Sequence, residues 1–158
     1  GHTEEAGYCL TTSAKRGPMR LISVIFGAPS MNERASQTRE ILAWGYANFE
    51  TVKVQPANQV LAKSKVWYGK SNDVQIGLAE NFNVTMPKGE ANAIKTQLVV
   101  QPKLTAPLKK GQVVGKYVAT LNGKVIAEKP LVALQAVEEA GFFAKMIDHI
   151  KQFFANLF

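Results

Sequence analysis

The chain has 158 residues, of which 46% are hydrophobic and 20% charged, proportions typical of folded domains and unlike those of disordered chains. No segment of the sequence approaches the ~20 consecutive apolar residues that a membrane-spanning helix requires. One cysteine, Cys9, cannot form an internal disulfide, and the two histidines, His2 and His149, lie near opposite ends without a second metal ligand at a suitable spacing. We therefore expect neither a metal site nor a cofactor.

The formal net charge of +7 is concentrated in the middle of the chain. Residues 52–138 contain twelve lysines, no arginine and five acidic residues, whereas the segments on either side are balanced. Nucleic-acid binding usually involves arginine for bidentate contacts and aromatic residues for stacking, so we expect no nucleic-acid partner. Two interpretations remain: a solvated Lys-rich β surface that prevents edge pairing, or weak attraction to an anionic lipid or polymer.

Two short segments near the start have the composition of β-strands and precede a predicted helix. Residues 7–15 and 19–26 are rich in Tyr, Leu, Thr, Val and Ile, and the turn Lys15-Arg16-Gly17-Pro18 favours an antiparallel pair. Ser30, followed by a glutamate three positions later, predicts the start of a helix over 31–50. Two strands and a helix are too few to close a core, so this segment needs a partner. The expected buried face of the helix consists of Ala35, Thr38, Ile41, Leu42, Gly45, Tyr46 and Phe49.

The segment 52–138 has the pattern of short strands separated by turns. Asn122-Gly123 is the strongest hairpin signal, and five prolines interrupt the apolar runs. Without a long helical pattern, this segment predicts a β-sandwich or small barrel of about 80–90 residues. The expected strands cover 60–67, 74–78, 82–87, 95–100, 111–121, 124–127 and 130–135.

The last segment predicts an amphipathic helix that begins after Gly141. At ~1.5 Å per residue it would be about 25 Å long, and its polar face excludes a spanning orientation. That face carries Lys145, Asp148, His149, Lys151, Gln152 and Asn156. The apolar stripe consists of Phe142, Phe143, Met146, Ile147, Ile150, Phe153, Phe154, Leu157 and Phe158.

Two interpretations compete for this helix. A terminal amphipathic helix usually packs on the core of its own domain. A β-sandwich that closes its own core, however, has no groove for so wide a stripe of large side chains. An exposed apolar surface of this kind marks a membrane or partner site, and we favour an anchor that lies in the plane of a membrane surface.

The chain contains no complete catalytic constellation: it lacks a Ser-x-x-Lys element, a phosphate-binding glycine loop and a Ser/His/Asp or Cys/His set. Its opening, GHTEEAGYCLTTSAKRGPMRLISVIFG, nevertheless resembles the strand pair that carries the Lys-Thr-Gly-His-Thr motif of serine D-alanyl-D-alanine carboxypeptidases of the penicillin-binding protein 5/6 type. The resemblance continues through ILAWGYANFETV, VWYG, APLKKGQVVG, LNGKVIAEKPLVALQAV and FFAKMIDHIKQFF, and so covers essentially the whole chain.

This resemblance implies an α+β multi-domain fragment. Residues 1–51 would supply the last strands and helix of a β-lactamase/transpeptidase-like catalytic domain, residues 52–138 an all-β sandwich stalk, and residues 139–158 the membrane-anchor helix. It also implies that Gly1, His2 and Thr3 belong to the strand that holds the substrate, with the His2 amide as one oxyanion donor. Lys-Thr would precede Gly1. A role for Arg34 with the substrate carboxylate is a weaker hypothesis.

The implied parent enzyme removes the terminal D-Ala from peptidoglycan pentapeptides through a serine acyl-enzyme, is acylated by β-lactams, and lies at the periplasmic face of the bacterial inner membrane. Its nucleophile is not in this chain, so the fragment itself is expected to be inactive. One alternative is a non-enzymatic, membrane-tethered β module for positioning or partner binding, which leaves the opening GHTEEAGYCL unexplained. Another is a basic nucleic-acid-binding domain, favoured only by the excess of lysine.

Overall fold

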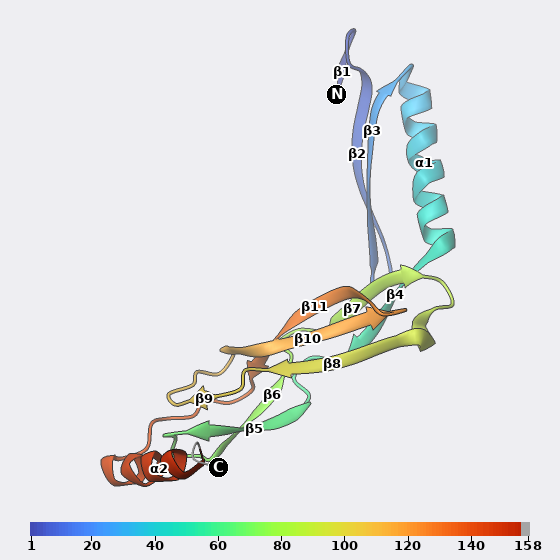
Figure 1. The fold of residues 1–158 in the computed structure, drawn as a ribbon. Helices are drawn as coiled ribbons and strands as arrows, with labels where there is room; N and C mark the ends of the chain where they lie inside the picture. The colour runs from blue at the N-terminus through green and yellow to red at the C-terminus, as the bar shows by residue number, and fades with distance from the viewer. Residues whose placement is uncertain (156–158) are drawn as a thin grey trace. The chain divides into compact units, whose positions relative to one another are not determined.

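The computed structural model describes residues 1–155, which form mostly β-sheets together with two α-helices (Figure 1). The chain divides into two compact units. The N-terminal unit consists of Gly1–Val52 and Asn83–Asn92, and the β unit consists of Lys53–Phe82 and the chain from Ala93 onward. The mostly-β character expected from the middle of the sequence is confirmed.

The N-terminal unit contains a three-stranded antiparallel sheet in the order β1-β2-β3, formed by β1 (His2–Thr3), β2 (Gly7–Arg16) and β3 (Met19–Ala28). The predicted turn joins β2 to β3, with Arg16 opposite Met19. Helix α1 (Met31–Asn48) runs along this hairpin (Figure 1). Both strands and the helix therefore lie where the sequence places them.

Helix α1 begins as predicted, because the Ser30 side chain accepts a hydrogen bond from the Glu33 N–H at 3.1 Å. Its end and its buried face differ from the prediction. Phe49 is extended and starts the next strand, and Ile41 is 48% exposed. Only the narrow β2–β3 hairpin packs against α1 in this unit, so Thr38 and Gly45 are buried while the rest of the stripe is partly or fully exposed.

The strands β4 (Phe49–Gln55) and β7 (Phe82–Pro87) pair in a two-stranded sheet. The Thr51 and Thr85 hydroxyls hydrogen-bond at 2.7 Å, and the Glu50 carboxylate accepts from the Gly89 N–H at 3.1 Å. A 3-10 turn spans Ala91–Ala93. The sequence predicts β7 correctly but misses β4, because the expected helix runs through residue 50 and no strand is expected between that helix and Val60.

The β unit contains a six-stranded sheet in the order β8-β10-β11-β6-β5-β9. Neighbouring strands are antiparallel except for the short parallel pair of β5 and β9. Tyr117 and Phe82 stack edge to face, with ring centroids 5.6 Å apart. The strands are β5 (Ala62–Trp67), β6 (Asp73–Gly77), β8 (Ile94–Val100), β9 (Leu104–Thr105), β10 (Val113–Leu121) and β11 (Lys124–Ala133).

The predicted Asn122-Gly123 turn joins β10 to β11, and both residues have the positive φ that such hairpin turns need, 50° and 79°. The sequence predicted two strands at 124–127 and 130–135, which was wrong: β11 is continuous through Pro130. On the side away from β10, β11 pairs with β6 only at Val132 and Ala133. Pro130 therefore lies where β11 is paired on one side alone, a position at which proline is tolerated.

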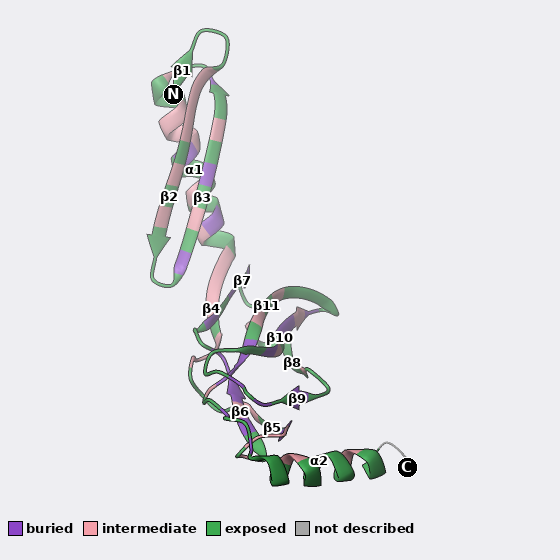
Figure 2. Cartoon of the chain, turned by 90° about the vertical axis from the view of Figure 1, so that its left-hand side faces the viewer, coloured by how far each residue is buried: buried purple, intermediate pink, exposed green. Residues whose placement is uncertain are grey.

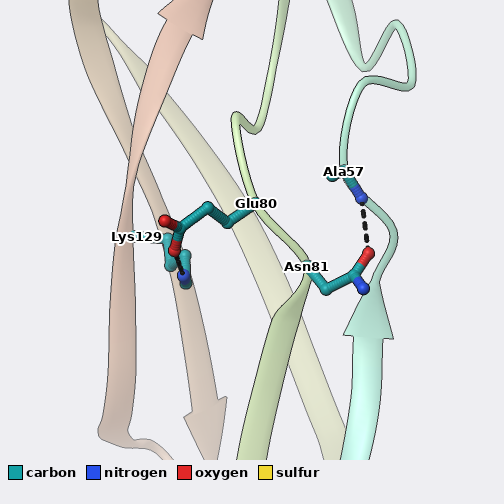
Figure 3. Close-up of polar contacts among 4 residues, drawn as sticks. All are labelled: Ala57, Glu80, Asn81 and Lys129. Carbon is teal, nitrogen blue, oxygen red and sulfur yellow. Dashed lines mark hydrogen bonds and ion pairs between the residues drawn. The ribbon is translucent and has the colours of Figure 1, made fainter.

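Buried side chains are concentrated in the β unit, as Figure 2 shows in purple. Polar contacts tie its loops, since the Ala57 N–H donates to Asn81 Oδ1 at 2.9 Å and Lys129 Nζ donates to Glu80 Oε2 at 2.8 Å (Figure 3). The strands and loops of this unit enclose an apolar core. The buried core side chains include Val66, Val74, Ile76, Leu78, Phe82, Leu104, Leu108, Val114, Leu131, Ala133 and Val137.

Helix α2 (Phe142–Ala155) confirms the predicted amphipathic helix within the described residues. None of the helices in this part of the chain is long and apolar enough to cross a membrane. Asn156, Leu157 and Phe158, which the sequence places on this helix, lie outside the described residues.

Candidate functional site

The edge of the three-stranded sheet carries the first candidate site. Gly1 and Cys9 form a hydrogen-bonded pair, with Gly1 N donating to the Cys9 carbonyl at 2.9 Å and Cys9 N–H donating to the Gly1 carbonyl at 2.8 Å. Residues in antiparallel strands alternate between bonded and non-bonded pairs. The next pair, His2 with Tyr8, is therefore non-bonded, and the His2 N–H points away from β2. Since β1 is an outer strand of this sheet, that amide faces its open edge.

The side chains of His2 and Thr3 have local roles at this edge. The His2 imidazole stacks on the Tyr8 ring, with ring centroids 3.9 Å apart. The Thr3 hydroxyl accepts a hydrogen bond from the Ala6 N–H at 3.0 Å, which closes the turn between β1 and β2. The backbone of this strand, rather than its side chains, thus faces the open edge.

Arg34 connects α1 to the same strand, a contact that the sequence did not predict. Its guanidinium donates to the Cys9 carbonyl at 3.1 Å and to the Gly1 carbonyl at 3.4 Å, and it lies 5.7 Å from the centre of the Tyr8 ring. Arg34 therefore holds the ends of β1 and β2 against the first turns of α1. A basic residue early in a helix that follows a hairpin is too common a pattern to reveal this contact.

Cys9 is half-buried, with Sγ 3.6 Å from the Ala6 carbonyl oxygen. Glu4 and Glu5 are exposed. Among the described residues, no group of three or more His, Cys, Asp or Glu side chains is arranged to hold a metal ion. The first candidate site therefore consists of the backbone of Gly1 and His2 and the Arg34 side chain behind it.

Large apolar side chains lie exposed on the N-terminal unit. Along β3, Ile22, Val24 and Phe26 alternate on one face and are 67%, 47% and 78% exposed. On α1, Trp44 is 60% exposed. An apolar groove lies between β3 and α1 and includes Ile22 and Trp44. It is lined by Leu21, Ile22, Ser23, Ile41, Leu42, Trp44, Gly45 and Phe49.

The second candidate site is the apolar face of α2. The face is exposed along its full described length, as Figure 2 shows in green. Phe142 and Phe143 stack edge to face with centroids 5.9 Å apart, and Phe153 and Phe154 do so at 5.8 Å. The exposed side chains are Phe142, Phe143, Met146, Ile147, Ile150, Phe153 and Phe154.

The apolar stripe of α2 does not pack on the core of its own domain, as far as the described residues extend. Its polar face contacts the β unit instead, through Asp148, His149 and Gln152. The sequence separated the two faces correctly but gave no sign that the polar one would be the packed one.

The lysines of the β unit are only partly engaged. Lys116 pairs with Glu128 at 3.0 Å, and Lys129 pairs with Glu80 at 2.8 Å. The hydrogen bond from Lys129, with its positive charge, holds the pKa of Glu80 below its usual value. Most of the remaining lysines of this unit are exposed, so the surface keeps its positive charge.

Comparison with known proteins relates the chain to a bacterial enzyme family. A family model described as penicillin-binding protein 5, C-terminal domain, matches residues 49–139. The D-alanyl-D-alanine carboxypeptidase DacC of Escherichia coli K12 is 41% identical over 100% of this chain and 40% of its own length. DacA of Haemophilus influenzae is 43% identical over 94% of this chain and 38% of its own. The chain thus spans about two fifths of the curated relatives it matches.

Solved structures lead to the same group. The penicillin-binding protein 5 of Haemophilus influenzae superposes with a TM-score of 0.78 at 41% identity, over 88% of this chain and 41% of that one. The D-alanyl-D-alanine carboxypeptidase DacD of Francisella tularensis gives a TM-score of 0.60 at 33% identity, over 89% of this chain and 35% of that one.

Proposed function

The chain belongs to the family of the penicillin-binding protein 5 C-terminal domain, and from this premise we propose that it is the C-terminal part of a serine-type D-alanyl-D-alanine carboxypeptidase. The relatives that carry this name continue well beyond the matched part, since the chain spans about 40% of their length. The parent enzyme would remove the terminal D-Ala from peptidoglycan pentapeptides and would be acylated by β-lactams.

The observation that carries the proposal is the direction of the His2 amide. A backbone N–H at the open edge of a sheet is a fixed dipole that can stabilise the oxyanion of an acyl-transfer intermediate. Gly1, which has no side chain, lets a peptide backbone approach the strand closely. Arg34 fixes this strand through the Gly1 and Cys9 carbonyls, so we assign it a positioning role rather than a contact with the substrate carboxylate.

The apolar surface of the N-terminal unit supports a place within a larger domain. Ile22, Val24, Phe26 and Trp44 would be costly to leave in water, and large exposed apolar side chains gathered on one unit indicate a contact surface. We assign to this surface the remainder of the catalytic domain, which would bring the nucleophilic serine and its lysine to the His2 edge. Residues 1–51 are then the end of the catalytic domain, and residues 52–138 are its β stalk.

Helix α2, in residues 139–158, is assigned as an anchor on the membrane surface. Its exposed apolar face matches an in-plane amphipathic helix, and the exposed Lys151 favours anionic headgroups. The parent enzyme would then be a peripheral protein at the periplasmic face of the bacterial inner membrane. Its β stalk would separate the active site from the lipid.

The oxyanion assignment is tested in the polypeptide extended upstream of Gly1. His2→Pro removes the amide donor together with the imidazole, and proline is tolerated at an outer strand whose N–H is unpaired. We expect D-Ala release from a pentapeptide to fall by about 10²–10³-fold in kcat, the usual loss for one oxyanion donor. His2→Ala keeps the amide and should lose far less. Equal rates for His2→Pro and His2→Ala would contradict the assignment.

The anchor assignment is tested by flotation with vesicles of phosphatidylglycerol and phosphatidylethanolamine. The 158-residue chain should float with them, and deletion of residues 142–158 should abolish this. If the extended polypeptide released no D-Ala while the chain still bound vesicles, the non-enzymatic, membrane-tethered module would replace the enzyme.

A further inference from the structure

One tyrosine of the β unit, Tyr68, makes two hydrogen bonds and a ring contact with α2. The Tyr68 backbone N–H donates to Asp148 Oδ2 at 2.9 Å, and the Tyr68 hydroxyl donates to Gln152 Oε1 at 2.9 Å. The Tyr68 ring lies 5.1 Å from the His149 ring, centroid to centroid. Because Asp148 and Gln152 are four residues apart, they lie one above the other on the same face of the helix. Tyr68 thus forms hydrogen bonds with two successive turns of α2.

The backbone around Tyr68 is specialised for this contact. Tyr68 has a φ of 60°, a left-handed conformation that is unfavourable for a bulky residue and that tends to persist where surrounding contacts impose it. Its carbonyl accepts from the Ala140 N–H at 2.8 Å, just before the helix. The next residue, Gly69, forms a β-bridge with Glu139. An added Cβ at Gly69 would lie 2.7 Å from both the Ser71 carbonyl oxygen and Val137 Cγ1, so only glycine fits there.

Charged groups reinforce the same junction. Lys103 Nζ donates to Gln152 Oε1 at 3.0 Å, so this one oxygen accepts from both Lys103 and Tyr68. Lys145 pairs with Glu139 at 2.8 Å across the start of the helix. Such exposed pairs are individually weak, but together they surround the tyrosine contacts. The polar face of α2 is therefore held at its start, its middle and near its end.

We propose that Tyr68 clamps α2 to the β unit, so that the helix and the β unit meet an anionic phospholipid surface as one rigid body. This inference rests on the proposed anchor function and adds a positioning device to it. A helix tied to a stalk only through Gly141 could lie on the membrane while the stalk swung above it. With the polar face engaged by Tyr68, the exposed face of α2 determines how the whole β unit is oriented on the lipid.

The clamp is compatible with lipid binding because the polar face of α2 contacts Tyr68, whereas the apolar face would contact the lipid. The contacts that α2 makes with Tyr68 come from Asp148, His149 and Gln152, which lie outside the stripe of exposed apolar side chains. Insertion of the apolar face into the headgroup region therefore requires none of these contacts to break. Lys151, which is exposed on α2, remains available to anionic headgroups.

Electron–electron distances between two spin labels test the clamp in the whole chain. In a Cys9→Ala background, labels are attached through Lys124→Cys on the β10–β11 hairpin and Ala144→Cys on α2, both exposed positions. The distance is measured in solution and on vesicles of phosphatidylglycerol and phosphatidylethanolamine. We expect one narrow distance in both states. Tyr68→Phe combined with Gln152→Ala should lose this single distance and give a broad distribution, and Asp148→Ala should act in the same direction.

Matched variants separate the clamp from general effects on folding. Tyr117→Phe removes a hydroxyl from another tyrosine of the β unit and should keep the narrow distance, as should Lys151→Ala. Asp148→Ala lies on the helix, outside the core, so it tests the clamp even if a Tyr68 variant fails to fold. Flotation of the same samples reports lipid binding separately.

The outcomes distinguish this proposal from the anchor itself. A wild-type chain that floats but loses its narrow distance on vesicles would overturn the clamp and leave the anchor standing. A narrow distance that survives both Asp148→Ala and the Tyr68→Phe/Gln152→Ala pair would overturn the assignment to Tyr68. A chain that does not float would overturn the anchor, and with it the orientation of the β unit on lipid.

Discussion

The two units of the chain differ in how far they bury the apolar side chains of their strands. In the β unit, Val74, Ile76 and Leu131 are completely buried. In the N-terminal unit, Ile22 and Phe26 belong to an equally apolar strand, yet they are 67% and 78% exposed. An apolar strand sequence therefore predicts a strand but does not indicate which part of the protein will cover it. The β unit buries a core between its own strands and loops, and we propose that the N-terminal unit relies on the rest of a catalytic domain.

The largest expected effect is on the free energy of unfolding, which should depend on a buried apolar side chain much more than on an exposed one. Leu131→Ala removes a fully buried side chain from β11 and should lower the free energy of unfolding by about 2–5 kcal/mol, through lost burial and the resulting cavity. Phe26→Ala in the same chain should change it by less than about 0.5 kcal/mol, because that side chain is already in water. Urea unfolding measures both. A comparable loss for Phe26→Ala would mean that the N-terminal unit is not open.

The next effect contrasts exposed phenylalanines in the two places. A fully buried Phe side chain stabilises its state by about 1.5–3 kcal/mol. Replacing Phe153 and Phe154 together with serine should therefore weaken binding to anionic vesicles by at least about tenfold. Phe26→Ser, the same substitution at an exposed site outside α2, should leave vesicle binding unchanged. Equal losses for the two variants would show that lipid does not select the face of α2.

A smaller effect is expected at the start of α1. Ser30→Ala removes the side chain that accepts from the Glu33 N–H and should destabilise the chain by about 1 kcal/mol. Ser30→Asp, which keeps an acceptor at this position, should restore most of the loss. The measurement is the urea midpoint followed by circular dichroism. Full stability in Ser30→Ala would indicate that tertiary contacts alone hold this helix.

The smallest effect concerns the ion pair between Lys70 and Glu138, next to the clamp. The hydrogen bond and positive charge of Lys70 lower the pKa of Glu138 from 4.5, so the pair stabilises the folded state at neutral pH. This contribution is lost as the pH falls below 4.5, through the lowered pKa of the folded state. Glu138→Gln should therefore be slightly less stable at neutral pH but lose less stability in acid. The exposed Glu5→Gln should behave like the wild type, and no difference between the two variants would contradict this account.

Much of the fold is local enough to be predicted from the sequence. The β2–β3 hairpin, the Ser30 cap, the strand Phe82–Pro87 and the Asn122-Gly123 turn all follow from turn chemistry, capping or alternation. Each depends on residues within a few positions of one another. The sequence failed where a local signal was ambiguous, as at Phe49, which continues the pattern of α1 but begins β4.

The sequence identifies the segments that carry the candidate sites, but not the contacts that these segments make with distant parts of the chain. The amphipathic pattern located the exposed face of α2, and the opening residues located the sheet edge. The contacts that fix both sites join residues far apart in the sequence, such as Arg34 with Gly1 and Tyr68 with Asp148. Such pairings depend on how distant segments pack, and no periodicity in the sequence encodes them.

The most direct test of the central assignment uses the polypeptide extended upstream of Gly1 through its Ser-x-x-Lys element. The polypeptide is treated with a fluorescent penicillin and then pelleted with anionic vesicles. We predict that it carries the label and pellets, that deletion of residues 142–158 leaves the label but abolishes pelleting, and that the 158-residue chain pellets unlabelled. An extended polypeptide that took no label would contradict the assignment of this chain to a penicillin-sensitive carboxypeptidase.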